Sequence, residues 1–132
     1  MPGIFTKIIN REIPGYIVAE TPEYIAFLDV FPLAEGHVLV VPRIETDYLF
    51  DMDDQQLGGI IVFAKKVARA LEKSVSCKRI GVAVIGLEVP HAHIHLIPLH
   101  SVADINFSRP KLKVPAERLQ QIADLIRTNF EE

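Results

Sequence analysis

The sequence predicts an α+β fold with about five strands in an antiparallel sheet, a long central helix and a shorter helix near the carboxyl terminus. Three observations support this. Short segments rich in apolar and β-branched residues are separated by turn residues. Two longer segments repeat apolar residues with helical spacing. Between Val89 and Pro98, three histidines alternate with apolar residues, as in a strand with two different faces.

The first strands are expected to form a hairpin. Ile13 to Glu20 and Tyr24 to Leu28 are rich in β-branched and aromatic residues, and the proline of the intervening Glu20-Thr21-Pro22-Glu23 favours a turn. Two further strands are expected in the continuous apolar runs His37 to Val41 and Arg79 to Ile85. With the histidine-rich segment, the predicted sheet has about five members.

The long helix is predicted between these two runs. One buried face is indicated by the i, i+3, i+4, i+7 spacing of Leu57, Ile60, Ile61, Ala64, Ala68 and Leu71. Asp53 and Gln56 resemble a capping box, with aspartate in place of serine or threonine. Gly58-Gly59 costs about 1 kcal/mol per glycine relative to alanine inside a helix. We therefore expect close packing at this pair; a poorly optimised helix end is the alternative.

A second amphipathic helix is predicted to open at Pro115 and to dock on the domain or on a partner. Its apolar side carries Leu119, Ile122, Ala123, Ile126 and Phe130. With 132 residues and 49% hydrophobic content, the chain is expected to form one domain without covalent cross-links. The expected core spans about residues 4–100, and the carboxyl-terminal loop and helix span about 101–131.

Composition excludes several classes of protein. The single cysteine, Cys77, excludes an intramolecular disulfide, and no long apolar run or signal-like amino terminus indicates export or a membrane span, so a cytoplasmic protein is expected. A net charge of −3 gives no general attraction to nucleic acid. Arg109, Lys111 and Lys113 are predicted to be solvated surface, with contact to a substrate phosphate as the less favoured alternative.

The three histidines are the clearest candidate for chemistry. In an extended strand His91, His93 and His95 share one face, while Ala92, Ile94 and Leu96 enter the core. Imidazoles combine nucleophilic and proton-carrying ability near neutral pH. A regular strand places the first and third Cα atoms about 13 Å apart, too far for all three rings to bind one metal ion. Catalysis is favoured; a metal held by a histidine pair and a structural role are the alternatives.

The run from His91 to Ile97 resembles the HφHφHφφ motif of the histidine triad (HIT) nucleotide hydrolases and transferases, where φ is apolar. Upstream segments resemble further blocks of that family in the same order: Ile4 to Pro14, Phe27 to Val30, and Gly36 to Pro42. The resemblance implies a HIT-like fold and a homodimer, in which the glycine pair would allow two backbones to approach each other across a two-fold interface.

The resemblance also implies transfer of a nucleoside monophosphate without a cofactor. His93 matches the nucleophile that attacks the α-phosphorus and forms a nucleotidyl-imidazole, which water then hydrolyses. The carbonyl of His91 would orient that ring, while the side chains of His91 and His95 would face phosphate oxygens or the leaving group. His37 matches a fourth histidine that supports the active site; an exposed histidine at a strand end is the alternative.

A purine nucleotide is the substrate that the resemblance implies. Asp29 matches the acid that binds both ribose hydroxyls, although aspartate at a strand end is commonly a turn former. The apolar walls around the base are matched by Ile4, Phe5, Ile8, Phe27 and Val30. Each of these five residues has a place in the core as its alternative role.

Two departures from the family affect these expectations. Many bacterial members bind zinc through an amino-terminal Cys-x-x-Cys and a later histidine, but Thr6 occupies one cysteine position and Pro42 to Glu45 contains no histidine. We therefore expect no structural zinc. The segment before the triad is shortened and places Glu88 on the leaving-group side. A carboxylate there repels a polyphosphate and attracts an amine.

The sequence therefore favours a phosphoramidate or aminoacyl-type conjugate as the substrate. The alternatives are a dinucleoside polyphosphate hydrolase, a noncatalytic nucleotide-binding or regulatory protein, and a metal-dependent hydrolase that uses a histidine pair.

Overall fold

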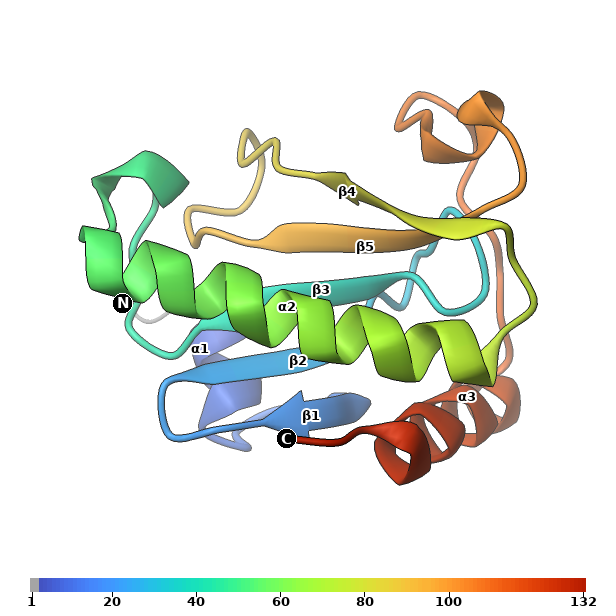
Figure 1. The fold of residues 1–132 in the computed structure, drawn as a ribbon, viewed down its shortest axis with the longest axis horizontal. Coiled ribbons are helices and arrows are strands. Elements are labelled where there is room, and N and C mark those ends of the chain that lie inside the picture. The colour runs from blue at the N-terminus through green and yellow to red at the C-terminus, as the bar shows by residue number, and fades with distance from the viewer. Residues whose placement is uncertain (1–2) are drawn as a thin grey trace.

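A five-stranded antiparallel sheet forms the centre of the molecule in the computed structural model, which describes residues 3–132 (Figure 1). The strand order is β1-β2-β3-β5-β4. The strands are β1 (Ile17–Glu20), β2 (Tyr24–Leu28), β3 (Val38–Pro42), β4 (Arg79–Ala83) and β5 (Ile94–Leu99). The predicted α+β class and strand number are confirmed. β1 begins later than expected, after Pro14, whose ring removes a backbone donor.

One face of the sheet is covered by α2 (Asp54–Ser74), which runs across it in Figure 1. The carboxylate of Asp53 accepts a hydrogen bond from the backbone N–H of Gln56 at 2.8 Å, so the expected cap is present. The expected inward position of Ile61 is wrong, because this side chain is 51% exposed. Ile60 is buried as expected, and Phe63 and Ala64, three and four residues later, lie on the same buried face of the helix.

The helix α3 (Ala116–Asn129) packs against α2 and β1 and belongs to the same apolar core. Its buried residues are Leu119, Ile122, Ala123 and Ile126, so the predicted docking surface lies on this chain. Short 3-10 turns occur at Leu49–Asp51 and Val102–Ile105. No helix within residues 3–132 is long and apolar enough to cross a membrane.

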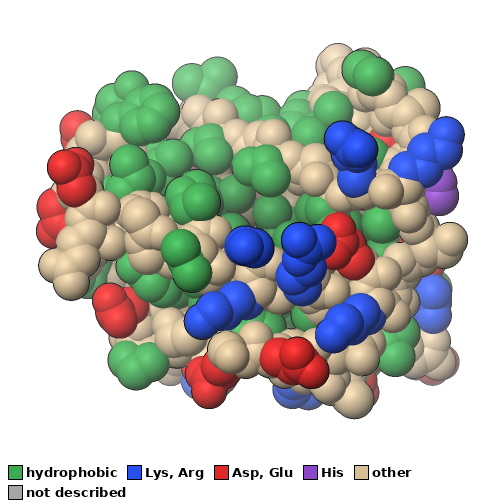
Figure 2. Space-filling view, viewed as in Figure 1, with side chains coloured by type: hydrophobic (Ala, Val, Ile, Leu, Met, Phe, Trp, Pro, Cys, Tyr) green, Lys and Arg blue, Asp and Glu red, His purple; other side chains and the backbone are tan. Residues whose placement is uncertain are grey.

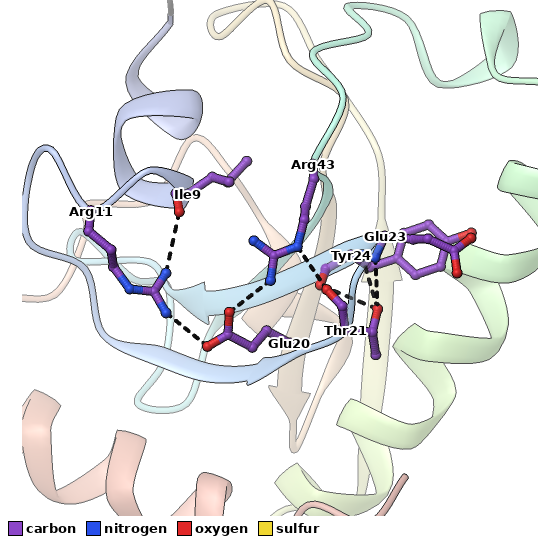
Figure 3. Close-up of polar contacts among 7 residues, drawn as sticks. All are labelled: Ile9, Arg11, Glu20, Thr21, Glu23, Tyr24 and Arg43. Atoms are coloured by element: carbon purple, nitrogen blue, oxygen red, sulfur yellow. Dashed lines mark hydrogen bonds and ion pairs between the residues drawn. The ribbon is translucent and has the colours of Figure 1, made fainter.

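The short helix α1 (Ile4–Ile9) lies on the other face of the sheet. Phe5 joins Ile25, Phe27, Leu39 and Val41 in a second, smaller apolar cluster there. A charged network holds the end of α1 to the hairpin (Figure 3). The two carboxylate oxygens of Glu20 bind Arg11 at 2.8 Å and Arg43 at 2.7 Å, and both guanidinium groups hold the pKa of Glu20 below its usual range.

The two helical glycines have different surroundings within the chain. A Cβ on Gly59 would collide with the phenol of Tyr24, whose hydroxyl donates to the carbonyl of Gln56 at 3.0 Å. A Cβ on Gly58 would meet nothing within 4 Å. The close packing expected at the pair is therefore found within one chain for Gly59, and a role for Gly58 in a dimer stays a prediction.

These surroundings predict opposite effects of alanine. Gly59→Ala should lower the free energy of unfolding by about 1–3 kcal/mol, because the buried Tyr24 ring must move. Gly58→Ala should raise it by about 0.5–1 kcal/mol in the isolated chain through helix propensity. Urea denaturation of both variants measures the difference. Destabilisation by Gly58→Ala would contradict the open surroundings and indicate that a second molecule packs there.

Candidate active site

The three histidines lie on the face of the sheet that α1 covers. The regular strand begins at Ile94, later than predicted, so His91 and His93 belong to an extended segment that leads into β5. The expected alternation nevertheless holds: Ala92, Ile94 and Leu96 belong to the core beneath α2. On the other face, the rings of His93 and His95 have centroids 4.9 Å apart, and Phe5 packs against His91 and His93.

His37 enters this cluster from the turn before β3. Gly36 precedes it with φ of +91°, a conformation that favours glycine, and a Cβ there would crowd the side chains of Leu71 and Pro98. The ring of His37 is buried and contacts His95 with centroids 5.2 Å apart. The predicted fourth histidine therefore lies beside the triad rather than on the surface.

A cavity of about 390 Å³ opens beside these rings. Its volume falls within the range of small-molecule sites. Its lining is formed by His37, His93 and His95 together with Phe5, Asp29, Phe31, Leu39, residues 85–89, Phe107 and Lys111. The side chains of two histidines of the triad thus reach the cavity, whereas His91 is buried behind Phe5.

A chain of hydrogen bonds assigns the protons on two rings. The backbone N–H of Leu33 donates to Nδ1 of His37 at 3.1 Å, so this nitrogen is unprotonated. The proton of neutral His37 is then on Nε2, which donates to Nδ1 of His95 at 2.9 Å. His95 therefore carries its own proton on Nε2, where it is available as a donor.

A second set of bonds orients His93. Its Nδ1 lies 2.7 Å from the carbonyl oxygen of His91, so Nδ1 carries the proton and Nε2 keeps a free lone pair. Nε2 of His91 donates to the carbonyl of Pro42 at 2.8 Å. Within residues 3–132, Nδ1 of His91 has no hydrogen-bond partner; the carboxylate of Glu45 lies 3.9 Å away. The arrangement presents one nucleophilic nitrogen beside one proton donor.

Burial favours the neutral form of His37, His91 and His95. It lowers the pKa of His37 to about 3 and that of His95 to about 4, and the neighbouring histidines and Lys111 add to both effects. Burial also lowers the pKa of His91. These directions agree with the hydrogen-bond chain, which requires neutral rings. Burial raises the pKa of Asp29, partly offset by the backbone N–H of Phe31, which donates to its carboxylate.

The structure brings some of the predicted nucleotide-binding residues to the cavity and leaves others away from it. Asp29 forms the turn bond with Phe31, as its turn-forming alternative predicts, and also lines the cavity, while its binding of ribose stays a prediction. Phe5 lines the cavity, while Phe27 and Ile8 lie in or against the apolar cluster around it. Ile4 and Val30 are 52% and 44% exposed and are not among the lining residues.

Several lining residues were not singled out by sequence reasoning. Phe31, Leu39 and Phe107 line the cavity, although no sequence pattern indicated that they belong to a site. Glu88, which the sequence did indicate, lines the cavity as part of residues 85–89. Lys111 is exposed, as expected for solvated surface, and also lines the cavity. Its contact with a substrate phosphate stays a prediction.

Two groups of residues carry side chains that can ligate a metal. Asp29, His37 and His95 offer ligand atoms within 4.8 Å of one another, but both ring nitrogens of His37 and Nδ1 of His95 are already in hydrogen bonds. Around Thr6, which occupies one of the cysteine positions expected of a zinc site, the carboxylate of Glu45 accepts from Gly3 N at 2.9 Å and from the Thr6 hydroxyl at 2.8 Å. Without thiolates, and with one imidazole nearby, this donor set does not suit a structural zinc.

Comparison with known proteins agrees with this geometry. The model of the HIT domain matches residues 10–102. The chain belongs to the HIT family. The fold agrees as well: a HIT-like crystal structure from Bartonella henselae, described as involved in cell-cycle regulation, is 32% identical with a TM-score of 0.83. That match covers 97% of this chain and 96% of the Bartonella chain. The predicted HIT-like fold is therefore confirmed.

Two HIT relatives illustrate how far function is known. An uncharacterized HIT-like protein of Borreliella burgdorferi is 35% identical, and the match covers 96% of this chain and 97% of that protein. The adenosine 5'-monophosphoramidase of Saccharomyces cerevisiae is 38% identical over 72% of this chain and 61% of the yeast protein. Since the match spans less than two thirds of the yeast protein, its activity is considered for this HIT protein only as a proposal.

The neutral, buried histidines predict a pH-dependent stability. In the unfolded chain each histidine takes up a proton near pH 6.5, whereas His95 and His37 resist protonation down to about pH 4 and 3. The unfolded state therefore binds more protons, and the free energy of unfolding falls as pH decreases from about 6.5 to 4. The expected slope is up to about 1.4 kcal/mol per pH unit for each histidine.

Urea denaturation at several pH values measures this slope. His95→Gln should flatten it between pH 6.5 and 4, even if the variant is less stable at neutral pH. His100→Gln, at an exposed position, is the matched control and should leave the slope unchanged. Equal slopes in the wild type and the His95 variant would contradict the neutral, buried state of this ring.

Proposed function

We propose that this HIT protein hydrolyses a purine nucleoside phosphoramidate or a related nucleotide conjugate through a covalent intermediate on His93. The observation that carries the proposal is the bond from Nδ1 of His93 to the carbonyl of His91, which leaves Nε2 free beside the cavity. Membership of the HIT family and the phosphoramidase relative support the same reaction class.

The reaction balances with the residues of this chain and solvent. Nε2 of His93 attacks the α-phosphorus, the bond from phosphorus to the leaving nitrogen breaks, and the departing nitrogen takes up a proton from solvent while the N–H at Nε2 of His95 donates a hydrogen bond to a phosphate oxygen. Water then attacks the nucleotidyl-imidazole, the monophosphate is released, His93 returns to its neutral form and a proton goes back to solvent. His37 orients His95, while Asp29 is assigned to the ribose and the cluster around Phe5 to the base.

The identity of the leaving group is inferred from charge. Glu88 lines the cavity, and a second carboxylate, Asp29, lies in the same lining. Additional phosphates of a dinucleoside polyphosphate would meet repulsion there, whereas an amine would be attracted. An amine-containing conjugate is therefore favoured over a polyphosphate. A noncatalytic nucleotide-binding protein is the alternative for the shortened segment at residues 84–89.

A two-fold dimer is also proposed. Val82 lies on the α2 side of the edge strand β4, as its pairing with buried Leu96 indicates, and Val84 lies just beyond the end of this strand; both are exposed. Ile61 and Val62 are exposed on α2. Figure 2 shows hydrophobic side chains over the part of this face where β4 and β5 run, and charged side chains over the remaining part. Such a patch on a small protein indicates an interface.

The nucleophile is tested by removing its ring. His93→Ala should lower kcat for adenosine phosphoramidate by about 10⁴-fold or more, because no other group forms the intermediate. Adenosine monophosphate binding should survive within a few fold. Acid quench of the wild type followed by mass analysis should detect a nucleoside monophosphate on the chain, and the variant should lack it.

Turnover by the variant near the wild-type rate would overturn the mechanism. Faster hydrolysis of diadenosine polyphosphates than of adenosine phosphoramidate by the wild type would overturn the leaving-group assignment.

The dimer is tested by adding a charge to the patch. Sedimentation should give a dimer for the wild type and a monomer for Val82→Glu, because a buried, unpaired carboxylate destabilises an interface. Leu125→Glu on α3 is the matched control, since this exposed residue lies by the opposite sheet edge, near β1. A wild-type monomer, or dissociation by both variants alike, would contradict the proposed interface.

A further inference from the structure

The loop between the second 3-10 turn and α3 brings a lysine into the active-site cavity. Lys111 lines this cavity together with His93 and His95. Its ammonium donates to the carbonyl oxygen of Phe107 at 2.9 Å and lies 5.5 Å from the centroid of that ring. The Phe107 ring packs edge-on against His95, with centroids 4.7 Å apart. These contacts hold the ammonium near the reacting histidines.

The other groups in the cavity do not supply a permanent positive charge. Among the described lining residues, Lys111 is the only lysine or arginine, whereas Asp29 and Glu88 are acidic. His37 and His95 are neutral at pH 7, because their pKa values are lowered to about 3 and about 4. A phosphate that enters the cavity therefore meets two carboxylates and one ammonium.

The neighbouring basic residues are placed differently. The guanidinium of Arg109 donates to the carbonyl oxygen of Ala103 at 2.7 Å and lies 3.5 Å from the carboxylate of Asp104. Lys113, which is exposed like Lys111, is not among the lining residues. Of the three basic residues in this loop, Lys111 alone is directed to the cavity.

We propose that Lys111 is a substrate-binding residue whose ammonium pairs with a nonbridging phosphate oxygen of the bound nucleotide. One of its three N–H groups is used by the Phe107 carbonyl, and the other two are available for the phosphate. An ammonium binds phosphate as a point charge, through a charge-assisted hydrogen bond. This inference rests on the proposed function and extends it to a phosphate contact outside the histidine motif.

Calorimetric titration with two ligands separates this contact from general damage to the cavity. Adenosine monophosphate carries the phosphate and adenosine lacks it. Lys111→Gln should weaken binding of the monophosphate about tenfold or more, the loss expected for a charge-assisted hydrogen bond, and leave adenosine binding within about twofold. Lys111→Arg keeps the charge and should retain most of the affinity. Lys113→Gln is the matched control and should bind both ligands as the wild type does.

The outcomes distinguish the two levels of the proposal. A selective loss of monophosphate affinity in Lys111→Gln supports the contact. Unchanged monophosphate affinity in this variant, or an equal loss for both ligands, would overturn the role of Lys111 and leave the proposed function intact. A wild-type protein that binds no adenosine monophosphate would overturn the proposed function, and this inference with it.

Discussion

The backbone N–H of Leu33 determines the protonation of the active site. Because it donates to Nδ1 of His37, the single proton of that neutral ring must lie on Nε2, and the bond to His95 passes the same constraint to the next ring. A main-chain group cannot change its donor character, unlike a water or a hydroxyl. The proton donor of His95 therefore has a defined position before any substrate enters.

The sheet separates two tasks that the same strand must perform. On one face, Ile94 and Leu96 join the large core under α2 and α3, which holds the backbone in place. On the other face, His95 lies beside Leu39, its cross-strand neighbour, at the edge of a much smaller apolar cluster. Stability thus comes mainly from the side that takes no part in chemistry, and the reactive side stays open to a ligand. Because neutral imidazole rings are buried on the reactive side, the free energy of unfolding falls in acid.

Local patterns predicted the regular elements and the triad well, because period two and helical spacing follow directly from backbone geometry. The inward position of Ile61 failed for a related reason: two adjacent apolar residues both fit a helical stripe, and the packing of Phe63 decided between them. The close packing at Gly59 was expected, but its partner could not be identified from sequence, since it is Tyr24 on a distant strand. Phe107 was missed, and Lys111 was assigned mainly to surface, because a loop without periodicity reaches the cavity only through the tertiary fold.

The attachment of the first helix illustrates how one carboxylate can substitute for an inorganic cross-link. One carboxylate oxygen of Glu45 accepts hydrogen bonds from the backbone N–H of Gly3 and from the hydroxyl of Thr6. These bonds connect the start of α1 to the segment beyond β3. These two hydrogen bonds involve no sulfur atom and no metal ion. The two bonds themselves offer no thiolate to an oxidant and no ion to a chelator, so the attachment at this end of α1 rests on carboxylate, amide and hydroxyl groups.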